Sequence, residues 1–401
     1  MKIITHVSTF GQNCGIGTYA THVLDGFRQS ADRSIAHHEI PLRSDIAKMK
    51  QSFLSRLKHY LNINIPKSDL LLVQHEFGIW GKSYEESVII FFLFLLKNFR
   101  SSRNVVIVIH TLADRSLDKT VHFPFRYRIV HRLGNWIFGQ LLRLATIYLR
   151  SLLLAHSSRV ATYLQTYYGV SSDKILIYPH PFVVKTPERA DADPEQAIKN
   201  ALSFRASILQ RTQQDDIVLV GIFGFINRYK GHEIAVEAIK SLPPNYHLIV
   251  FGITHPENET NPTMDLISRF KILYPNRITL HCHATDEEAA PFLRICTVLV
   301  APYLPVNLSA SGAFTYCLTS GVPVIASNIP AFMDIYSEAE AFVKINQGSV
   351  EQLAAAILEL SSNQFLRARV VNNAIKYADA YSFQKFSVFL GRTLLDRQNY
   401  L

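Results

Sequence analysis

The sequence predicts an α/β protein with two Rossmann-like, doubly wound domains, and three observations lead to this prediction. With 401 residues, 48% of them apolar, the chain is long for a single hydrophobic core. Short, continuous apolar runs alternate with segments of helical periodicity, as expected of parallel strands that are covered on both faces. Glycine-bearing turns follow several of these runs, as they do in open α/β sheets. We expect domains over residues 1–183 and 184–380 and a final helix over 381–401.

The first domain is expected to begin with a strand over Lys2–Ser8, a loop over Thr9–Gly17 and then an amphipathic helix. Gly15, Ile16 and Gly17 close this loop beyond the carboxyl end of the strand. Glycines at such a point let backbone N–H groups come close to a ligand, so these three residues are candidate substrate contacts. The alternative is that the glycines serve only the tight turn.

Polar side chains follow the next two expected strands, Asp69–Gln74 and Val105–Ile109. The first strand leads into His75 and Glu76, and the second leads into His110. Because α/β sites form at the carboxyl ends of strands, we predict that these three side chains belong to a site. A structural role in the core is the alternative for each histidine.

Two more strands of the first domain are expected over Leu152–His156 and Lys174–Tyr178, with a helix between them. The second of these strands leads into His180, which is a further candidate for a substrate contact. Residues 188–216 are polar and charged, and they are expected to form the linker and a helix that leads into the second domain.

Two apolar segments of the first domain raise the question of a membrane. Val88–Leu96 consists of nine apolar residues, too few to span a bilayer, and we expect a buried helix, with a membrane-dipping helix as the alternative. Phe123–Leu154 mixes five arginines with aromatic and aliphatic residues. That composition suits a surface that rests on lipid headgroups, but a helix packed on its own domain with a solvated basic face is equally consistent with it.

Charge is unevenly distributed along the chain, whose formal net charge is +9. Residues 1–183 contain 22 Lys and Arg against 11 Asp and Glu, whereas the remainder contains 19 against 21. A basic half suits nucleic acid, anionic lipid or a phosphorylated acceptor. No nucleic-acid-binding motif accompanies the charge, so we expect one of the last two and no nucleic acid.

The cellular compartment is indicated by the cysteines and by the start of the chain. The four cysteines are scattered without a CxxC pair, which disfavours a disulfide framework or a zinc site and fits a reducing compartment. The opening MKIITHV lacks the sustained apolar core of a secretory signal. We therefore expect a cytoplasmic protein without a bound metal.

The second domain is expected to open with a strand over Ile217–Phe223, which leads through Gly224 to Arg228, Lys230 and Gly231. A helical pattern follows at once. Free N–H groups at a helix start, together with neighbouring cations, form a site for an anion, and phosphate is the commonest choice. An ordinary strand–loop–helix with solvated cations is the alternative.

The remaining elements of the second domain continue the alternation of strands and helices. Strands are expected over His247–Gly252, Ile278–His281, Val298–Ala301 and Val322–Ala326; helices are expected over Thr263–Tyr274, over Glu287–Cys296 and from Ser311-Gly312 to Thr319. A long helical region is expected to complete the chain.

Six motifs, in this order, resemble one known family. They are the GIG loop, QHEFGIWG, HT at a strand end, AHSSRVATYLQTYYGVSSDKILIYPHP, RYKG and SASGAFTYCLTSGVPVIAS. The chain resembles nucleotide-sugar glycosyltransferases of the GT-B fold, similar to family 4 (glycosyl transferases group 1). The resemblance implies two Rossmann-like domains that face each other across a cleft. The second domain would bind a nucleotide-diphosphate sugar, the first an acceptor, and the final helix would cross back to the first domain.

The resemblance also implies roles for single residues. Lys230, with Arg228 nearby, matches the family's diphosphate clamp, and Gly15 and Gly17 match a loop over that diphosphate. His110 matches a histidine near the donor sugar. Further contacts to phosphate and substrate are implied for Ile16, Ser309, Ser311, Gly312 and Tyr316.

One departure from the family pattern concerns its Glu-x7-Glu pair, whose positions fall at Leu308 and Tyr316. His110 and Lys230 match the family pattern and so favour an active hexosyltransferase of the retaining type. It would transfer glucose or mannose to a glycan or lipid-linked acceptor in envelope or exopolysaccharide synthesis. It would need no metal or other cofactor, and it would work in the cytoplasm at the inner face of the membrane. The absent glutamates favour a catalytically silent GT-B protein that binds a nucleotide or a partner; a GT-B phosphorylase or epimerase is a third possibility.

Overall fold

The computed structural model describes residues 2–11, 14–29, 35–43, 52–112, 125–184, 194–214, 216–252, 262–281, 286–304 and 308–395. The chain divides into two compact units. The first contains Met1–Pro181, Asn307–Ala310 and Tyr381–Leu401, and the second contains Phe182–Val306 and Ser311–Ala380. The short segment Asn307–Ala310 groups with the first unit, which the sequence had not led us to expect.

The first unit contains a six-stranded parallel sheet in the order β2-β1-β3-β4-β5-β6. Its strands are β1 (Lys2–Ser8), β2 (Ile35–Pro41), β3 (Ser68–His75), β4 (Ser102–Ile109), β5 (Ser151–Ala155) and β6 (Ile175–Ile177). The central strands are buried almost throughout, as their apolar runs predict. The strand order reverses between β1 and β3, and the carboxyl ends of strands at such a reversal are where open α/β sheets bind ligands.

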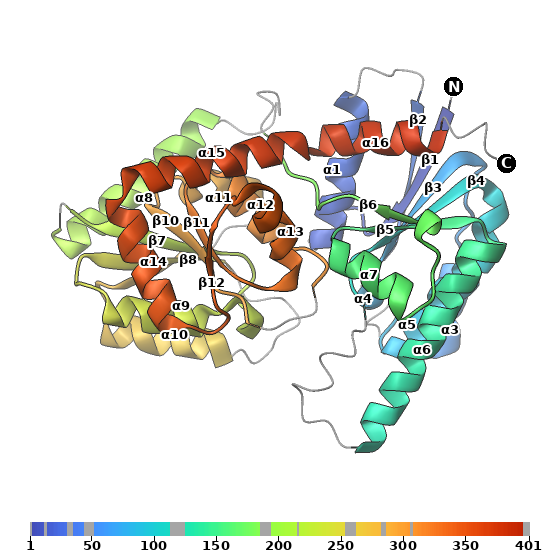
Figure 1. Ribbon diagram of the computed structural model, residues 1–401, viewed down its shortest axis with the longest axis horizontal. Helices are drawn as coiled ribbons and strands as arrows, with labels where there is room; N and C mark the ends of the chain where they lie inside the picture. The colour runs from blue at the N-terminus through green and yellow to red at the C-terminus, as the bar shows by residue number, and fades with distance from the viewer. Residues whose placement is uncertain are drawn as a thin grey trace. The chain divides into compact units, whose positions relative to one another are not determined.

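Helices cover both faces of this sheet (Figure 1). They are α1 (Gly15–Gln29), α3 (Phe53–Asn62), α4 (Phe77–Trp80), α5 (Tyr84–Asn98), α6 (Phe125–Tyr148), α7 (Ser158–Thr166) and α16 (Phe383–Leu395); single 3₁₀ turns occupy Phe99–Ser101 and Ser172–Lys174. Helices α3, α5, α6 and α7 pack into one core with alternate residues of the strands. Helices α1 and α16 lie side by side, and they pack on β1 and β3.

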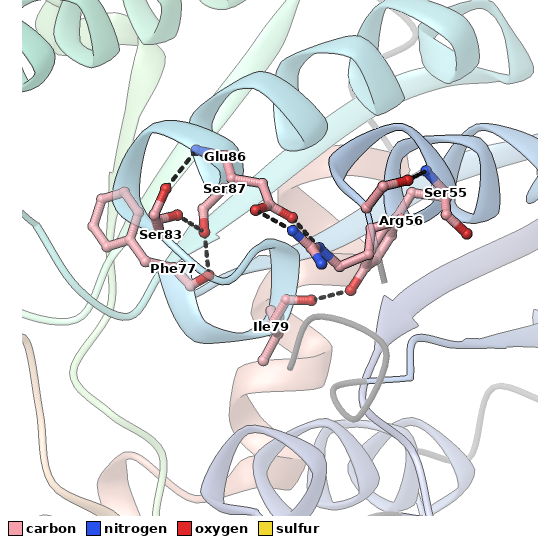
Figure 2. A network of polar contacts seen from close by, with 9 residues as sticks. Ser55, Arg56, Phe77, Ile79, Ser83, Glu86 and Ser87 are labelled. Atoms are coloured by element: carbon pink, nitrogen blue, oxygen red, sulfur yellow. Dashed lines mark hydrogen bonds and ion pairs between the residues drawn. The ribbon is translucent and has the colours of Figure 1, made fainter. Parts of the chain in front are cut away.

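A buried ion pair ties α3 to α5 (Figure 2). The guanidinium of Arg56 donates through Nε and Nη2 to both carboxylate oxygens of Glu86, with 2.8 Å between Nη2 and Oε2. Next to it, Ser87 Oγ donates to the carbonyls of Phe77 at 2.6 Å and of Ser83 at 2.9 Å. These contacts fix the short helix α4 directly after β3.

The second unit contains another six-stranded parallel sheet, in the order β12-β11-β10-β7-β8-β9. Its strands are β7 (Val218–Phe223), β8 (Tyr246–Phe251), β9 (Ile278–His281), β10 (Val298–Ala301), β11 (Val324–Ser327) and β12 (Val343–Ile345). Counted from β7, this is the 3-2-1-4-5-6 order of Rossmann sheets, and it reverses between β7 and β10. The prediction of an α/β protein with two doubly wound sheets is confirmed.

Helices flank this sheet too (Figure 1). They are α8 (Pro194–Thr212), the 3₁₀ turn η4 (Arg228–Lys230), α9 (His232–Ser241), α10 (Pro262–Leu273), α11 (Asp286–Leu293), α12 (Gly312–Thr319), α13 (Pro330–Ala339), α14 (Val350–Ser362) and α15 (Gln364–Ala380). Helices α9, α10 and α14 share one core with β7, β8 and β10. The long helical region that was predicted for the end of the chain is interrupted by β12, which pairs with β11.

Within the part of the chain that the structure describes, no helix combines the length and the apolar character that crossing a bilayer requires.

Candidate active site

Lys230 lies on η4, the single turn between β7 and α9 in the second unit. Its backbone path depends on Gly231, which has a φ of +74° and caps η4 in the left-handed region. A Cβ atom on Gly231 would lie 1.9 Å from the carbonyl oxygen of Pro302. The glycine therefore lets the turn after β7 approach the segment after β10, the two strand ends at the reversal of the sheet.

Lys230 is buried, with 3% of its surface exposed, and it takes part in a polar network. Its Nζ donates to the hydroxyl of Tyr303 and lies 4.5 Å from the centre of that ring. The Tyr303 hydroxyl lies 2.9 Å from Ser311 Oγ, which in turn accepts a hydrogen bond from the backbone N–H of Phe314 and caps the start of α12. A buried ammonium group and a helix N-terminus are thus joined through one tyrosine.

Burial shifts the pKa values of the groups in and beside this network. It raises the pKa of Tyr303 well above 10, with a smaller effect from Tyr229, so the hydroxyl stays protonated. Burial, followed by the charge of Lys230, lowers the pKa of His232 to about 4. The site therefore carries the charge of the lysine beside neutral neighbours, and it suits an anion such as a phosphate.

The other residues of the second unit that the sequence singled out lie around this network. Gly312 is the first residue of α12, and nothing occupies the space within 4 Å of a Cβ built on it, among the residues that the structure describes. Arg228 is on the same turn as Lys230, but its side chain is exposed. Tyr316 is buried on α12, with its ring centre 6.2 Å from that of Phe223.

In the first unit, His110 follows β4 and is held by Gln74 of β3. Gln74 Oε1 accepts from His110 Nε2 at 2.5 Å, and Gln74 Nε2 donates to His6 Nε2 at 2.7 Å. A neutral His110 with its proton on Nε2 has a lone pair on Nδ1. Burial lowers the pKa of His110 well below 6.5, with smaller effects from other histidines, so this ring is neutral near pH 7.

A second feature of this unit is a histidine cluster, which we define as His110, His156 and His180 around the ring of Tyr19. The ring centres of the histidines lie 4.9, 5.3 and 5.3 Å from that of Tyr19. His156 Nδ1 donates to the carbonyl of Tyr178 and His180 Nδ1 to that of Pro181, each at 2.9 Å. Burial lowers the pKa of His156 to about 4 and that of His180 to about 3. The cluster is therefore a neutral, aromatic surface at the carboxyl ends of the strands.

Gly15, Ile16 and Gly17 form the first turn of α1, which corrects the predicted loop over these residues. The thiol of Cys14 precedes them and accepts from the backbone N–H of Gly17 at 3.3 Å. Thr9 Oγ1 lies 2.9 Å from the same sulfur. The glycines consequently present a helix N-terminus beside β1, at the reversal of the first sheet.

Glu76 and Ser309 connect to the residues that follow β4. Glu76 Oε2 accepts from Thr111 Oγ1 at 2.7 Å. Burial raises the pKa of the Glu76 carboxyl, and the hydrogen bond from Thr111 opposes the rise. Ser309 Oγ donates to the carbonyl of His110. The structure thus brings both residues to the same strand end as His110.

His75 is a correction, because its side chain lies in the core rather than beside Glu76. It is fully buried, and its ring centre lies 4.9, 4.6 and 5.0 Å from those of Phe77, Phe91 and Phe138. Neither ring nitrogen has a hydrogen-bond partner among the described residues. Burial lowers the pKa of His75 to about 3. This environment belongs to a neutral core side chain.

Four residues of these two sites were missed by the sequence analysis: Gln74, Tyr19, His156 and Tyr303. Gln74 is the last residue but one of β3 and His156 directly follows β5, so their position was a usable signal. Tyr19 and Tyr303 act through partners that are distant in sequence, which no local pattern reveals. Among the described residues, no group of three or more His, Cys, Asp or Glu side chains is arranged to hold a metal ion.

Comparison with protein families adds an independent finding. The model for glycosyl transferases group 1 matches residues 205–377, which include Lys230, Tyr303 and Ser311. The uncharacterised glycosyltransferase MJ1178 of Methanocaldococcus jannaschii is 26% identical over 160 residues. That alignment covers 39% of this chain and 42% of the archaeal protein, so less than half of that relative is spanned.

Solved structures resemble nearly the whole chain. Anabaena Alr3699/HepE in complex with UDP-glucose is 14% identical, with a TM-score of 0.66, over 99% of this chain and 100% of the other. Sucrose-phosphate synthase from Thermosynechococcus elongatus is 13% identical, with a TM-score of 0.67, over 99% of both chains. WaaG, a glycosyltransferase involved in lipopolysaccharide biosynthesis, is 15% identical, with a TM-score of 0.61, over 98% of this chain and 99% of its own. The chain therefore has the fold of GT-B glycosyltransferases, and its residues 205–377 match the model for glycosyl transferases group 1.

Proposed function

We propose that this chain is a retaining glycosyltransferase that transfers a hexose, glucose or mannose, from a nucleotide-diphosphate sugar to a glycan or lipid-linked acceptor. The observation that carries the proposal is the network of Lys230, Tyr303 and Ser311. It lies at the strand-order reversal of the second sheet and inside the residues that match the family model. A buried cation next to a helix N-terminus suits a diphosphate.

The chemistry of the proposal follows from where charge develops. When the bond between the sugar and the diphosphate breaks, the leaving diphosphate gains negative charge. The ammonium of Lys230 and the first N–H groups of α12 are fixed before the reaction, so they stabilise that charge without reorganisation. Tyr303 keeps the ammonium in place. In this proposal the protein's own groups supply the stabilisation, no metal is required, and no side chain is assigned as a nucleophile.

The first unit would contribute His110 at the sugar and acceptor side. A neutral imidazole whose Nε2–H is held by Gln74 offers Nδ1 as an acceptor for a sugar hydroxyl. The N-terminal turn of α1, with Gly15 and Gly17, offers backbone N–H groups of the same kind as those of α12.

The relatives guide the choice of donor and pathway. HepE has been crystallised with UDP, with UDP and glucose, and with UDP-glucose. UDP sugars are therefore the first donors to test. WaaG takes part in lipopolysaccharide biosynthesis. We extend this to propose a role in envelope or exopolysaccharide synthesis, on the cytoplasmic side of an anionic membrane with peripheral contact.

Calorimetric titration of the full chain with UDP, GDP, ADP and their sugar conjugates tests the donor site without knowledge of the acceptor. We expect one base to bind and the others to bind more weakly. If no nucleoside diphosphate binds to the folded chain, the catalytically silent partner-binding protein replaces this proposal.

A further inference from the structure

The outer face of α6 in the first unit is apolar and cationic. From residue 132 to residue 148, every exposed position is either an arginine or a large apolar residue. These residues are Arg132, Leu133, Trp136, Ile137, Arg143, Leu144, Ile147 and Tyr148, and the six apolar ones are 41–71% exposed. The opposite face of the helix, with Phe138 and Leu142, is buried in the core. A surface helix normally has a polar outer face, so α6 is unusual.

Helix α5 extends this surface. Ile89, Leu93 and Leu96 recur at helical spacing and are 45%, 37% and 54% exposed. Helices α5 and α6 lie side by side (Figure 1), and both bury their inner faces in the same core. Their outer faces therefore point to the same side of the unit. We call the exposed residues of α6 and these three residues of α5 the α5–α6 surface.

The positive charge of the α5–α6 surface indicates an anionic partner. The sequence contains no Asp or Glu between Asp118 and Asp173, and Arg132, Arg143 and Arg150 are exposed along α6 and at its end. Large apolar side chains mixed with arginines are typical of helices that lie in the interface of an anionic bilayer. A dimer of two copies is the alternative. In a two-fold dimer the same surface of each copy is in contact, so the arginines of α6 would face each other, and the segment between Asp118 and Asp173 has no carboxylate to pair with them.

We propose that the α5–α6 surface docks the protein on an anionic lipid bilayer, with α6 lying along the membrane plane and its outer face among the headgroups and upper acyl chains. The ion pair of Arg56 and Glu86 holds α5 to α3 and so fixes the position of α5 in the first unit. In one respect the inference rests on the proposed function, because docking serves catalysis only if the acceptor is lipid-linked.

Tryptophan fluorescence offers a direct test. The chain has two tryptophans, of which Trp80 is fully buried and Trp136 is 51% exposed at the centre of the α5–α6 surface. We expect vesicles containing phosphatidylglycerol to shift the emission of the full chain to the blue, and lipids brominated in their acyl chains to quench it. Trp136→Phe should abolish the shift while the chain still binds. Neutral phosphatidylcholine vesicles should have little effect.

Flotation with the same vesicles compares two matched triple variants. Trp136→Ser/Leu144→Ser/Ile147→Ser removes exposed apolar residues from the α5–α6 surface and should abolish flotation. Ile272→Ser/Leu273→Ser/Phe365→Ser removes residues of the second unit that are 79%, 71% and 92% exposed and should float like the wild type.

Single changes of arginine to glutamine measure the contribution of charge. Arg143→Gln and Arg150→Gln should each weaken binding about fivefold, corresponding to about 1 kcal/mol per cation. Raised salt should reduce the difference between each variant and the wild type, because it screens these exposed charges.

Three outcomes would overturn the proposal: no preference for anionic vesicles, binding without quenching of Trp136, or a dimer in solution that only the first triple variant dissociates. The last would make this surface an interface between copies. Titration with nucleoside diphosphates is independent of the docking, so a failed donor site and a failed membrane surface give different results.

Discussion

The position of His75 in an aromatic core predicts a specific loss of stability in acid. The unfolded side chain has a pKa near 6.5, and burial lowers the folded value to about 3. At pH 7 the unfolded chain binds about a quarter of a proton at this residue, and at pH 5 it binds nearly one, whereas the folded chain binds almost none at either pH. Stability is therefore present above the unfolded pKa and is lost as the pH falls, by about 2 kcal/mol from this residue over that range. His6 and His156 are buried with pKa values of about 3 and 4, and they add losses in the same direction.

The test is to replace His75 by a residue that does not titrate and to measure unfolding at both pH values. His75→Leu should reduce the difference in unfolding free energy between pH 7 and pH 5 by about 2 kcal/mol. Any constant packing penalty cancels in that difference. Phe91→Leu is the matched control, because it alters the same core without removing a titratable group. Its stability should change with pH as that of the wild type does.

Urea unfolding followed by tryptophan fluorescence is suited to this experiment, because both tryptophans belong to the first unit. If His75→Leu and the wild type lose the same stability between pH 7 and pH 5, His75 is not a neutral core residue. If His75→Leu loses nucleoside diphosphate binding but keeps its stability, this histidine belongs to the active site after all.

Three further predictions concern the two sites and the ion pair between α3 and α5. Lys230→Met should weaken nucleoside diphosphate binding by about 1.5–3 kcal/mol in calorimetry, because it removes a charge-assisted hydrogen bond to the ligand. The control is Lys240→Met, a change at an exposed lysine of α9, which should have little effect. Gln74→Glu should place a carboxylate within hydrogen-bond distance of His110 Nε2 and so raise the pKa of His110. The acid limb of the pH–rate profile should therefore move to higher pH. An unchanged profile would show that Gln74 is not the partner of His110. Arg56→Leu should lower the free energy of unfolding in urea by about 3 kcal/mol, because it leaves the buried Glu86 carboxylate without its cation. The double variant Arg56→Leu/Glu86→Leu should recover most of that loss. Equal stability of the single and double variants would contradict this.

The sheets were largely predictable from the sequence, because buried parallel strands give continuous apolar runs. Predicted bounds for β1, β9 and β10 agree with the structure. The edge strands β2 and β12 were missed. An edge strand pairs on one side only, so its sequence can be polar, and the IAHHEIP segment of β2 shows no such run. The first turn of α1 was also missed, because two glycines disfavour a helix unless surrounding contacts hold it.

The site was predictable where a polar residue directly follows a strand. Glu76 and His110 were identified in this way. Lys230 was identified from the helix start that follows its loop, and Ser311 from the family resemblance. Tyr303, which joins Lys230 to Ser311, depends on a contact between residues 73 positions apart. His75 shows the limit of the rule. It is the last residue of β3 and alternates in phase with Leu71 and Val73, so it lies on the face of the sheet that packs into their core. His110 lies one residue beyond its strand and escapes that alternation.

The measurement that most directly tests the central claim is release of nucleoside diphosphate from a broad panel of nucleotide sugars, with and without candidate glycan and lipid-linked acceptors. The account predicts that the wild type turns over at least one donor, and that Lys230→Met and His110→Ala each lower the rate at saturating donor while Lys240→Met does not. A folded wild type that neither binds nor cleaves any donor in the panel would contradict it, as would turnover unaffected by Lys230→Met.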